Sequence, residues 1–165
     1  MGLGPAVVGT GPGPRAALAR GAALAGLAIA ETRTTAAHGL SYPLTGRLGV
    51  PHGVAVALQL RWLRPHNAAV TDADCRHPAG AAAVRRLVAD AERACGGDLD
   101  GLLGRLLARA GYPGTLAGLL AGRGLDPADW QPPLARALAS SRSRNNPREI
   151  RPDSLLAALK EVPAP

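Results

Sequence analysis

The chain has 165 residues, 47% of them hydrophobic, which is the size of one ordinary domain and enough apolar surface for a core. The apolar residues are mostly Ala and Leu, Phe is absent, and long β-branched runs are missing, so an all-α fold is expected. Cys75 and Cys95 are too few for a disulfide framework and suit a reducing compartment. A cytoplasmic protein is therefore expected.

The net charge of +7 raises nucleic acid as a partner, but the distribution of the charge argues against it. The arginines are scattered through the whole chain, and Lys160 is its only lysine. The side chains able to stack on bases are Trp62, Trp130, Tyr42 and Tyr112. We interpret the arginines as solvated surface charge and expect no nucleic-acid partner, although a basic nucleic-acid binder stays a competing hypothesis.

Residues 1–14 contain five glycines and three prolines, which predicts a flexible leader. The glycines at 9, 11 and 13 are similar to a dinucleotide-binding turn, in which the backbone approaches a pyrophosphate. The third glycine of that motif would fall at Pro14, and too few residues precede the turn to form its strand. A loop is the preferred interpretation.

The Ala- and Leu-rich stretch 15–31 predicts a long buried helix. Its apolar contacts are assigned to Leu18, Leu24, Leu27 and Ile29. The alternative is a signal peptide, because Arg15 and Arg20 precede an apolar segment that ends in small residues. The apolar run is too short to span a bilayer, so no membrane partner is expected.

The remaining pattern predicts a compact helical bundle without internal repeats. Further helices are expected at 34–40, 52–63, 79–95, 99–110, 115–122, 130–140 and 153–161. Proline and glycine residues between 40 and 52 are expected to end the helix at 34–40, and Pro65 is expected to end the helix at 52–63. Segments 67–78 and 140–152 are predicted to be exposed loops, with Asp72 or Asp74 capping a turn and Asp153 as the N-cap of the last helix.

Two of the four histidines, His38 and His52, lie in the most apolar part of the chain. Imidazole suits iron and zinc, but a catalytic site needs about three protein ligands. On one continuous helix a separation of 14 residues would place the two rings roughly 21 Å apart, so a turn between them is required. The breakers that allow this turn are Pro43, Gly46, Gly49 and Pro51. The alternative is a pair of partly buried structural histidines.

The other potential metal ligands form a weaker pattern. Cys75 and His77 lie in Cys-x-His spacing, but a zinc site requires a second pair of similar ligands, and none follows nearby. We assign these two side chains no metal role.

Three segments carry a resemblance to a known family: LAGLAIA at 24–30, TTAAHGLSYPLT at 34–45 and GVPHGVAVAL at 49–58. Together with Asn146, Pro147, Arg148, Ile150 and the start of the last helix, they resemble the C-terminal domain of iron-containing alcohol dehydrogenases. The resemblance covers about residues 15–162. It implies that 15–165 form the helical domain of that family, a bundle of the dehydroquinate synthase-like type.

The resemblance also implies a chemistry. His38 and His52 match two histidines that hold a divalent metal, iron or zinc, and Tyr42 stands where many members carry a further histidine. The metal would act as a Lewis acid on a small aldehyde as hydride arrives from NAD(P)H, with Tyr42 lining the pocket or donating a hydrogen bond.

The family's other two ligands come from a D-x-x-x-H stretch. No Asp precedes position 72 and no His precedes position 38, so this ligand pair is absent from the chain. The nucleotide-binding α/β domain is likewise expected to be missing, because of truncation, a misplaced start or a split enzyme. A separate nucleotide-binding chain or self-association is the expected partner, and the chain alone is expected to be inactive. The alternative is a non-catalytic remnant that acts as a helical interaction module.

The sequence of residues 34–42 is most similar to that of the branch of the family that reduces phosphonoacetaldehyde. An anionic phosphonate requires a cation, for which Arg33 and Arg47 are the candidates.

Overall fold

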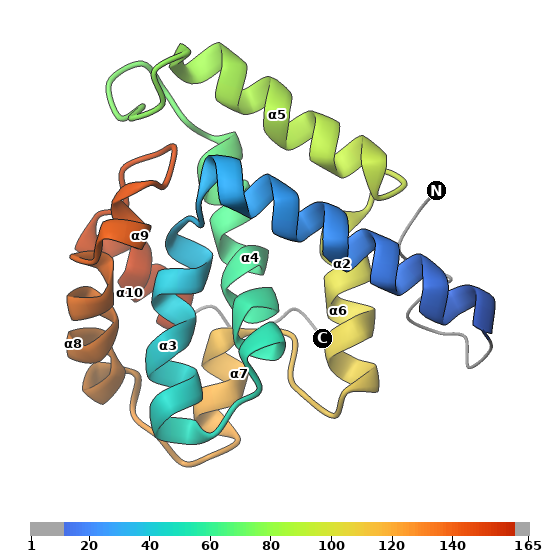
Figure 1. Cartoon of the computed structure of the whole chain (residues 1–165). Helices are drawn as coiled ribbons and strands as arrows, with labels where there is room; N and C mark the ends of the chain where they lie inside the picture. The colour runs from blue at the N-terminus through green and yellow to red at the C-terminus, as the bar shows by residue number, and fades with distance from the viewer. Residues whose placement is uncertain (1–11, 161–165) are drawn as a thin grey trace.

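The computed structural model describes residues 12–160, and this part of the chain contains helices and no strands (Figure 1). The helices are α2 (Pro12–Thr32), α3 (Ala36–Leu48), α4 (His52–Ala68), α5 (Gly80–Ala94), α6 (Leu99–Arg109), α7 (Leu116–Ala121), α8 (Pro127–Leu138), α9 (Ser141–Arg144) and α10 (Pro152–Lys160). A single isolated bridge pairs Cys75 with Arg148. The all-α prediction is confirmed.

The predicted leader falls partly outside the described residues, since 1–11 are not among them. Residues 12–14 form the first turn of α2, so the loop prediction is wrong for them. Pro12 and Pro14 fit there because the first N–H groups of a helix have no intrahelical acceptor.

The core lies around α3 and α4, which pack against each other at the centre of the bundle (Figure 1). Helices α8 and α9 pack on α3, α5 and α6 pack on α4, and α10 packs on α7 and α8. Leucines fill the interior, among them Leu40, Leu44, Leu58, Leu63 and Leu134, each with 1% of its surface exposed or less. Their burial holds the two central helices in a fixed relationship.

Pro43 does not interrupt α3, so the prediction that the helix ends at Leu40 is wrong. A proline inside a helix costs about 3 kcal/mol. Leu40 and Leu44 flank it and are fully buried, and burial of each leucine contributes roughly 1.5–3 kcal/mol. Tertiary packing therefore offsets the local penalty and carries the helix on to Leu48.

Gly49 ends α3 and starts the reversal toward α4. Its φ of 64° is left-handed, its N–H donates to the Thr45 carbonyl oxygen at 3.2 Å, and the Val50 N–H donates to that of Leu44 at 3.4 Å. This pair of bonds is a Schellman termination, for which glycine is the favoured residue. The predicted turn is thus present but confined to residues 49–51, after which α4 begins at His52.

Helix α4 also continues past its proline, which corrects the predicted end before Pro65. Trp62 and Leu63 are buried on one side of it. On the other side, His66 Nε2 lies 2.9 Å from the carbonyl oxygen of Glu149 and ties the last turn to the C-terminal part of the chain. As in α3, contacts around the proline outweigh the lost backbone hydrogen bond.

The segment 140–152 is not an exposed loop, which contradicts the prediction. It contains α9, and Ser143 and Asn146 are buried. The Asn146 amide donates to Asn67 Oδ1 and to the Arg148 carbonyl oxygen, both at 2.8 Å. Asp153 lies inside the first turn of α10 instead of at its N-cap.

In the loop after α4, Asp74 makes the predicted turn. Its carboxylate accepts hydrogen bonds from the Thr71 N–H at 2.7 Å and from the Thr71 hydroxyl at 2.9 Å. Arg148 Nε donates to the same carboxylate at 2.7 Å. These bonds hold the loop against the segment that follows α9.

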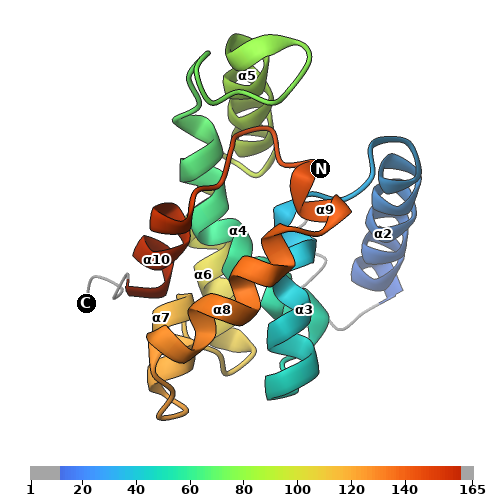
Figure 2. The same ribbon diagram turned by 90° about the vertical axis from the view of Figure 1, so that its left-hand side faces the viewer.

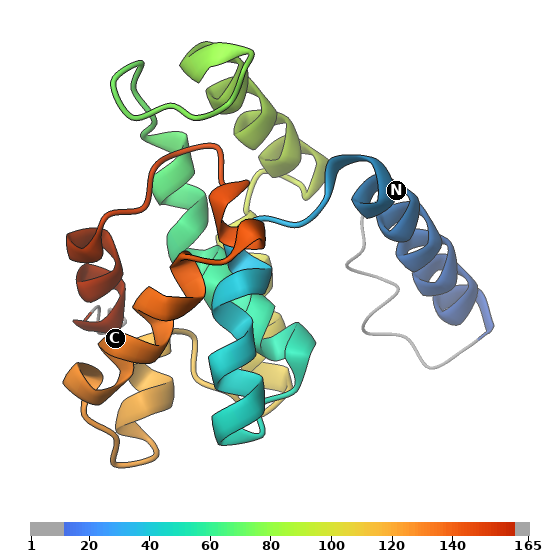
Figure 3. The same cartoon turned by 60° about the vertical axis from the view of Figure 1, so that its left-hand side comes forward.

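Helix α2 stands apart from the bundle (Figures 2 and 3). It has no buried residue, and Leu24 and Leu27 are 66% and 68% exposed. Leu18 and Ile29 are also exposed, so the predicted apolar contacts of these four side chains are wrong. The apolar residues of α2 are distributed over all of its faces, so the helix has no single apolar stripe that could pack on the bundle. Across residues 12–160, no helix combines the length and the apolar character that crossing a bilayer demands.

Candidate metal centre

His38 and His52 meet beside the reversal between α3 and α4. His38 lies in the first turn of α3, and His52 is the first residue of α4. The Nε2 atom of His52 is 3.2 Å from the Nδ1 atom of His38, and the ring centroids are 5.2 Å apart. The convergence predicted from the sequence is therefore present, and it is the three-residue link 49–51 that allows it.

The distance between the two nitrogens matches what one metal ion requires. Nitrogen ligands lie about 2.0–2.1 Å from zinc, so two of them on a tetrahedral ion are about 3.3 Å apart. The observed 3.2 Å is within that geometry. The pair has the nitrogen–nitrogen spacing of two neighbouring positions in one coordination sphere.

Ser41 connects the two histidines from inside α3. Its hydroxyl lies 2.7 Å from the carbonyl oxygen of His38 and 3.1 Å from Nδ1 of His52, and the residue is fully buried. We assigned Ser41 no role from the sequence. The available signal was its position three residues after His38, which places both on one face of a helix.

Tyr42 lies beside the pair, against the ring of His52. Its ring stacks on that of His52, with centroids 5.7 Å apart and planes inclined by 19°. The residue is 46% exposed, so the stack lies at the surface of the bundle and a small molecule has access to it. Tyr42 thus lies next to the histidines, where a pocket residue is expected.

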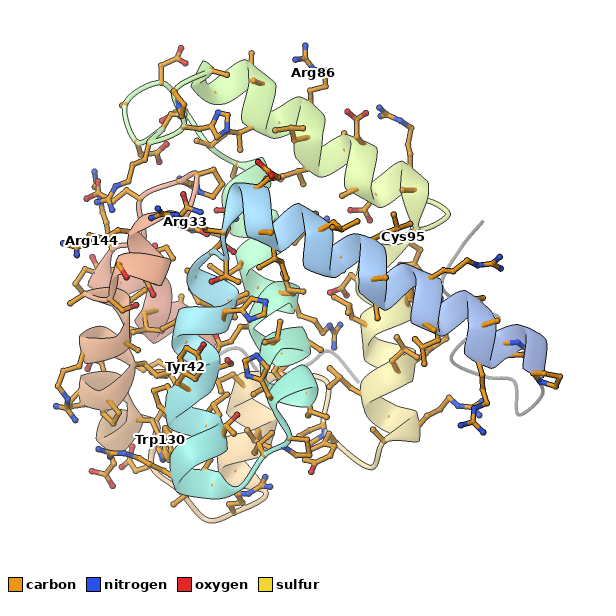
Figure 4. The ribbon with its side chains drawn as sticks, viewed as in Figure 1. Arg33, Tyr42, Arg86, Cys95, Trp130 and Arg144 are labelled. Carbon is orange, nitrogen blue, oxygen red and sulfur yellow. The ribbon has the colours of Figure 1, made fainter. Side chains whose placement is uncertain are left out.

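The two candidate phosphonate cations lie in separate places. Arg47 lines a surface cavity of about 540 Å³ together with Tyr42 and Arg136. Arg33 lines another, of about 260 Å³, together with Arg144 at α9 (Figure 4). Arg47 therefore shares a cavity with the tyrosine that stacks on His52, whereas Arg33 does not.

Further metal ligands do not gather around the pair within residues 12–160, where no group of three or more His, Cys, Asp or Glu side chains is placed to hold a metal. His66 bonds to the Glu149 carbonyl oxygen, and burial lowers its pKa. His77 Nδ1 accepts from the Ala79 N–H at 3.2 Å, and Cys75 Sγ lies 3.7 Å from the His77 carbonyl oxygen. The contacts of His77 and Cys75 are local to the loop that precedes α5.

A match to a known protein family includes the residues of the candidate centre. The sequence pattern of the C-terminal part of the Fe-containing alcohol dehydrogenase family matches residues 12–162. The chain belongs to this family. The match covers the helical bundle and both histidines of the candidate centre, so the resemblance found in the sequence is confirmed.

A curated relative supports the assignment. Phosphonoacetaldehyde reductase of Streptomyces viridochromogenes is 37% identical to this member of the family over 147 residues, which is 89% of this chain and 36% of the relative. The chain thus spans about a third of the relative's length. No significant match to a solved structure was found.

Proposed function

We propose that this chain is the metal-binding part of an NAD(P)-dependent oxidoreductase that reduces a small aldehyde. His38 and His52 hold a divalent metal, iron or zinc, and Tyr42 lines the pocket beside it. The observation that carries the proposal is the 3.2 Å approach of two imidazole nitrogens, from positions 14 residues apart, at a spacing that one ion requires. Family membership supports a metal and a nicotinamide cofactor in general.

The chemistry follows from the donor set and its surroundings. When bound, a divalent metal supplies a Lewis acid that polarises the aldehyde and stabilises the negative charge that develops on its oxygen. His38 and His52 would supply two of its ligands. Tyr42 holds a wall of the pocket through its ring, and its phenol O–H donates a hydrogen bond to the substrate oxygen.

The hydride donor and the other ligands come from outside the 165 residues in this proposal. A catalytic metal site has about three protein ligands, and the described residues bring two together. The partner is a nucleotide-binding domain, on a separate chain or in a longer polypeptide, that carries NAD(P)H and the remaining ligands. Two imidazoles alone give weak metal binding, so the chain by itself is expected to be inactive.

Phosphonoacetaldehyde is the substrate that the named relative suggests. Of the two arginines considered from the sequence, Arg47 is the better placed to receive a phosphonate, because it shares a cavity with Tyr42 and Arg136. The site of action is the cytoplasm. Cys75 and Cys95 support this, because both are free thiols.

The exposed helix α2 favours a second function, that of a non-catalytic helical interaction module. Its leucines are exposed, and such side chains mark a surface that another protein covers. A remnant of this kind would bind its partner equally well after loss of either imidazole. The enzyme hypothesis instead requires both imidazoles.

The test is reconstitution. The chain is co-expressed with the nucleotide-binding domain of the Streptomyces relative, and oxidation of NADH or NADPH is followed with phosphonoacetaldehyde and with unsubstituted small aldehydes. We expect activity that His38→Ala and His52→Ala each abolish and that His77→Ala leaves unchanged. A stable complex that is inactive with every aldehyde, or whose formation and activity ignore both histidine variants, would contradict the proposal.

A further inference from the structure

We propose that Ser41 is a positioning residue that fixes the tautomer of His52 and so aims a lone pair of Nε2 into the metal position before any metal is bound. The inference rests on the proposed metal-binding function and concerns a step that precedes it. It assigns a role to a fully buried hydroxyl that contacts both histidines.

The location of the serine hydrogen follows from one distance. The Ser41 hydroxyl oxygen and the His38 carbonyl oxygen are 2.7 Å apart. Two oxygens at this separation repel each other unless a hydrogen lies between them, and the carbonyl has none to give. The hydroxyl therefore donates to the carbonyl, in the i to i−3 arrangement open to serine inside a helix.

The serine has only one hydrogen, so it must be an acceptor toward His52. Nδ1 of His52 lies 3.1 Å from the same hydroxyl oxygen, a normal length for an N–H···O bond. Nδ1 thus carries the ring hydrogen, and Nε2 of the neutral ring keeps its lone pair. Ser41 is fully buried, so its hydroxyl accepts from the inner side of the exposed His52 ring.

The same reasoning about hydrogens applies to the contact between His52 and His38. Nε2 of His52 is 3.2 Å from Nδ1 of His38, and two facing lone pairs at that distance would repel. In the metal-free protein His38 Nδ1 therefore donates its hydrogen to His52. When a metal binds, His38 would have to move that one hydrogen from Nδ1 to Nε2, whereas His52 already has the tautomer that binding requires.

The experiment observes ring nitrogens directly in the full metal-free chain. Histidines labelled with ¹⁵N are recorded by long-range ¹H–¹⁵N correlation NMR in the presence of a chelator at a pH where the rings are neutral, and signals are assigned with His38→Ala and His52→Ala. We expect a protonated Nδ1 and an unprotonated Nε2 for His52. Ser41→Ala shifts His52 toward the Nε2–H form, Ser41→Thr keeps the wild-type pattern, and Ser154→Ala in α10 is the matched control.

A His52 ring with its hydrogen on Nε2 in the wild-type chain overturns the inference, whether or not the alanine variant folds. An unchanged pattern in a folded Ser41→Ala variant overturns it as well. In a second measurement Co²⁺ is titrated while the broadening of the His38 and His52 signals is followed, and Ser41→Ala is expected to weaken binding about 10- to 100-fold. Because two imidazoles bind a metal weakly, Co²⁺ is titrated to high concentration, and complete absence of binding there with the expected tautomer would contradict the proposed function and leave the role of Ser41 intact.

Discussion

The ring of Tyr42 lies nearly parallel to that of His52, 5.7 Å away, so one aromatic side chain both shields an imidazole and presents a phenol to the surface. The two roles are separable. The ring contributes packing, and the O–H contributes a hydrogen bond.

Replacing Tyr42 with Phe keeps the stack and removes only the hydroxyl. In the reconstituted enzyme we expect kcat to fall about 10- to 100-fold, the loss of one hydrogen bond to a charged group of roughly 1.5–3 kcal/mol. Co²⁺ binding stays unchanged in this variant, and Tyr42→Ala weakens it because the His52 ring loses its neighbour. Equal kinetics for wild type and Tyr42→Phe would remove the phenol from the mechanism.

Truncation of a central leucine tests the core. Leu44→Ala leaves a cavity between α3 and its neighbours, and we expect the free energy of unfolding to fall by about 2–5 kcal/mol in urea titrations. Leu24→Ala on α2 is the matched control. Its side chain is exposed, so its effect is expected to stay within about 0.5 kcal/mol. A large effect at Leu24 would mean that α2 packs on the bundle in solution.

Asp74 gives the fold a specific dependence on pH. Hydrogen bonds from the Thr71 backbone N–H, followed by the bond from Arg148, lower the pKa of Asp74 to about 2. A carboxyl whose pKa is depressed by folding stabilises the protein above its unfolded value, near 4, and this contribution disappears as the pH falls toward 2.

We therefore expect Asp74→Asn to be less stable than wild type at neutral pH and the difference to vanish between about pH 4 and pH 2. Asp72→Asn, an exposed position in the same loop, is the control. Thermal melting of wild type and both variants, from neutral pH down to about pH 2, measures the difference. A constant difference at all pH values would show that the amide fails for steric reasons and not because the charge is lost.

The exposed leucines of α2 predict self-association of the isolated chain. We expect light scattering to show an apparent mass that rises with concentration, and Leu24→Gln combined with Leu27→Gln to reduce this rise. Leu87→Gln on α5, where the side chain is 55% exposed, controls for a general loss of hydrophobic surface. A wild-type chain that stays monomeric at high concentration would contradict the expectation.

The sequence was sufficient for the helical class, which depends on local signals, and the convergence of the histidines was predicted from the breakers between them together with the family resemblance. Composition selects helix, and glycine and proline at 49–51 end one helix and start the next. The prolines at 43 and 65 misled the prediction. Their local penalty is offset by buried neighbours whose packing partners are distant in the chain.

The segment after α8 was missed for a related reason. Serines, asparagines and arginines are typical of an exposed loop, yet Asn146 is buried because Asn67, 79 residues earlier, satisfies its amide. The role of Ser41 depends on two contacts within 3.1 Å, one of them to another helix, and residue spacing gives no such distances. The sequence predicted that His38 and His52 meet, whereas the contacts of Asn146 and Ser41 require coordinates.

The left-handed turn at Gly49 also limits how this protein can vary. The length of the link 49–51 sets the distance between the two rings, since one added residue lengthens the link by about 3.3–3.6 Å. A functional site tolerates displacement of only about 0.5 Å. Insertions that most surface loops accept are therefore excluded here, and engineered or natural homologues that bind a metal in this manner must keep the length of this link even where its sequence changes.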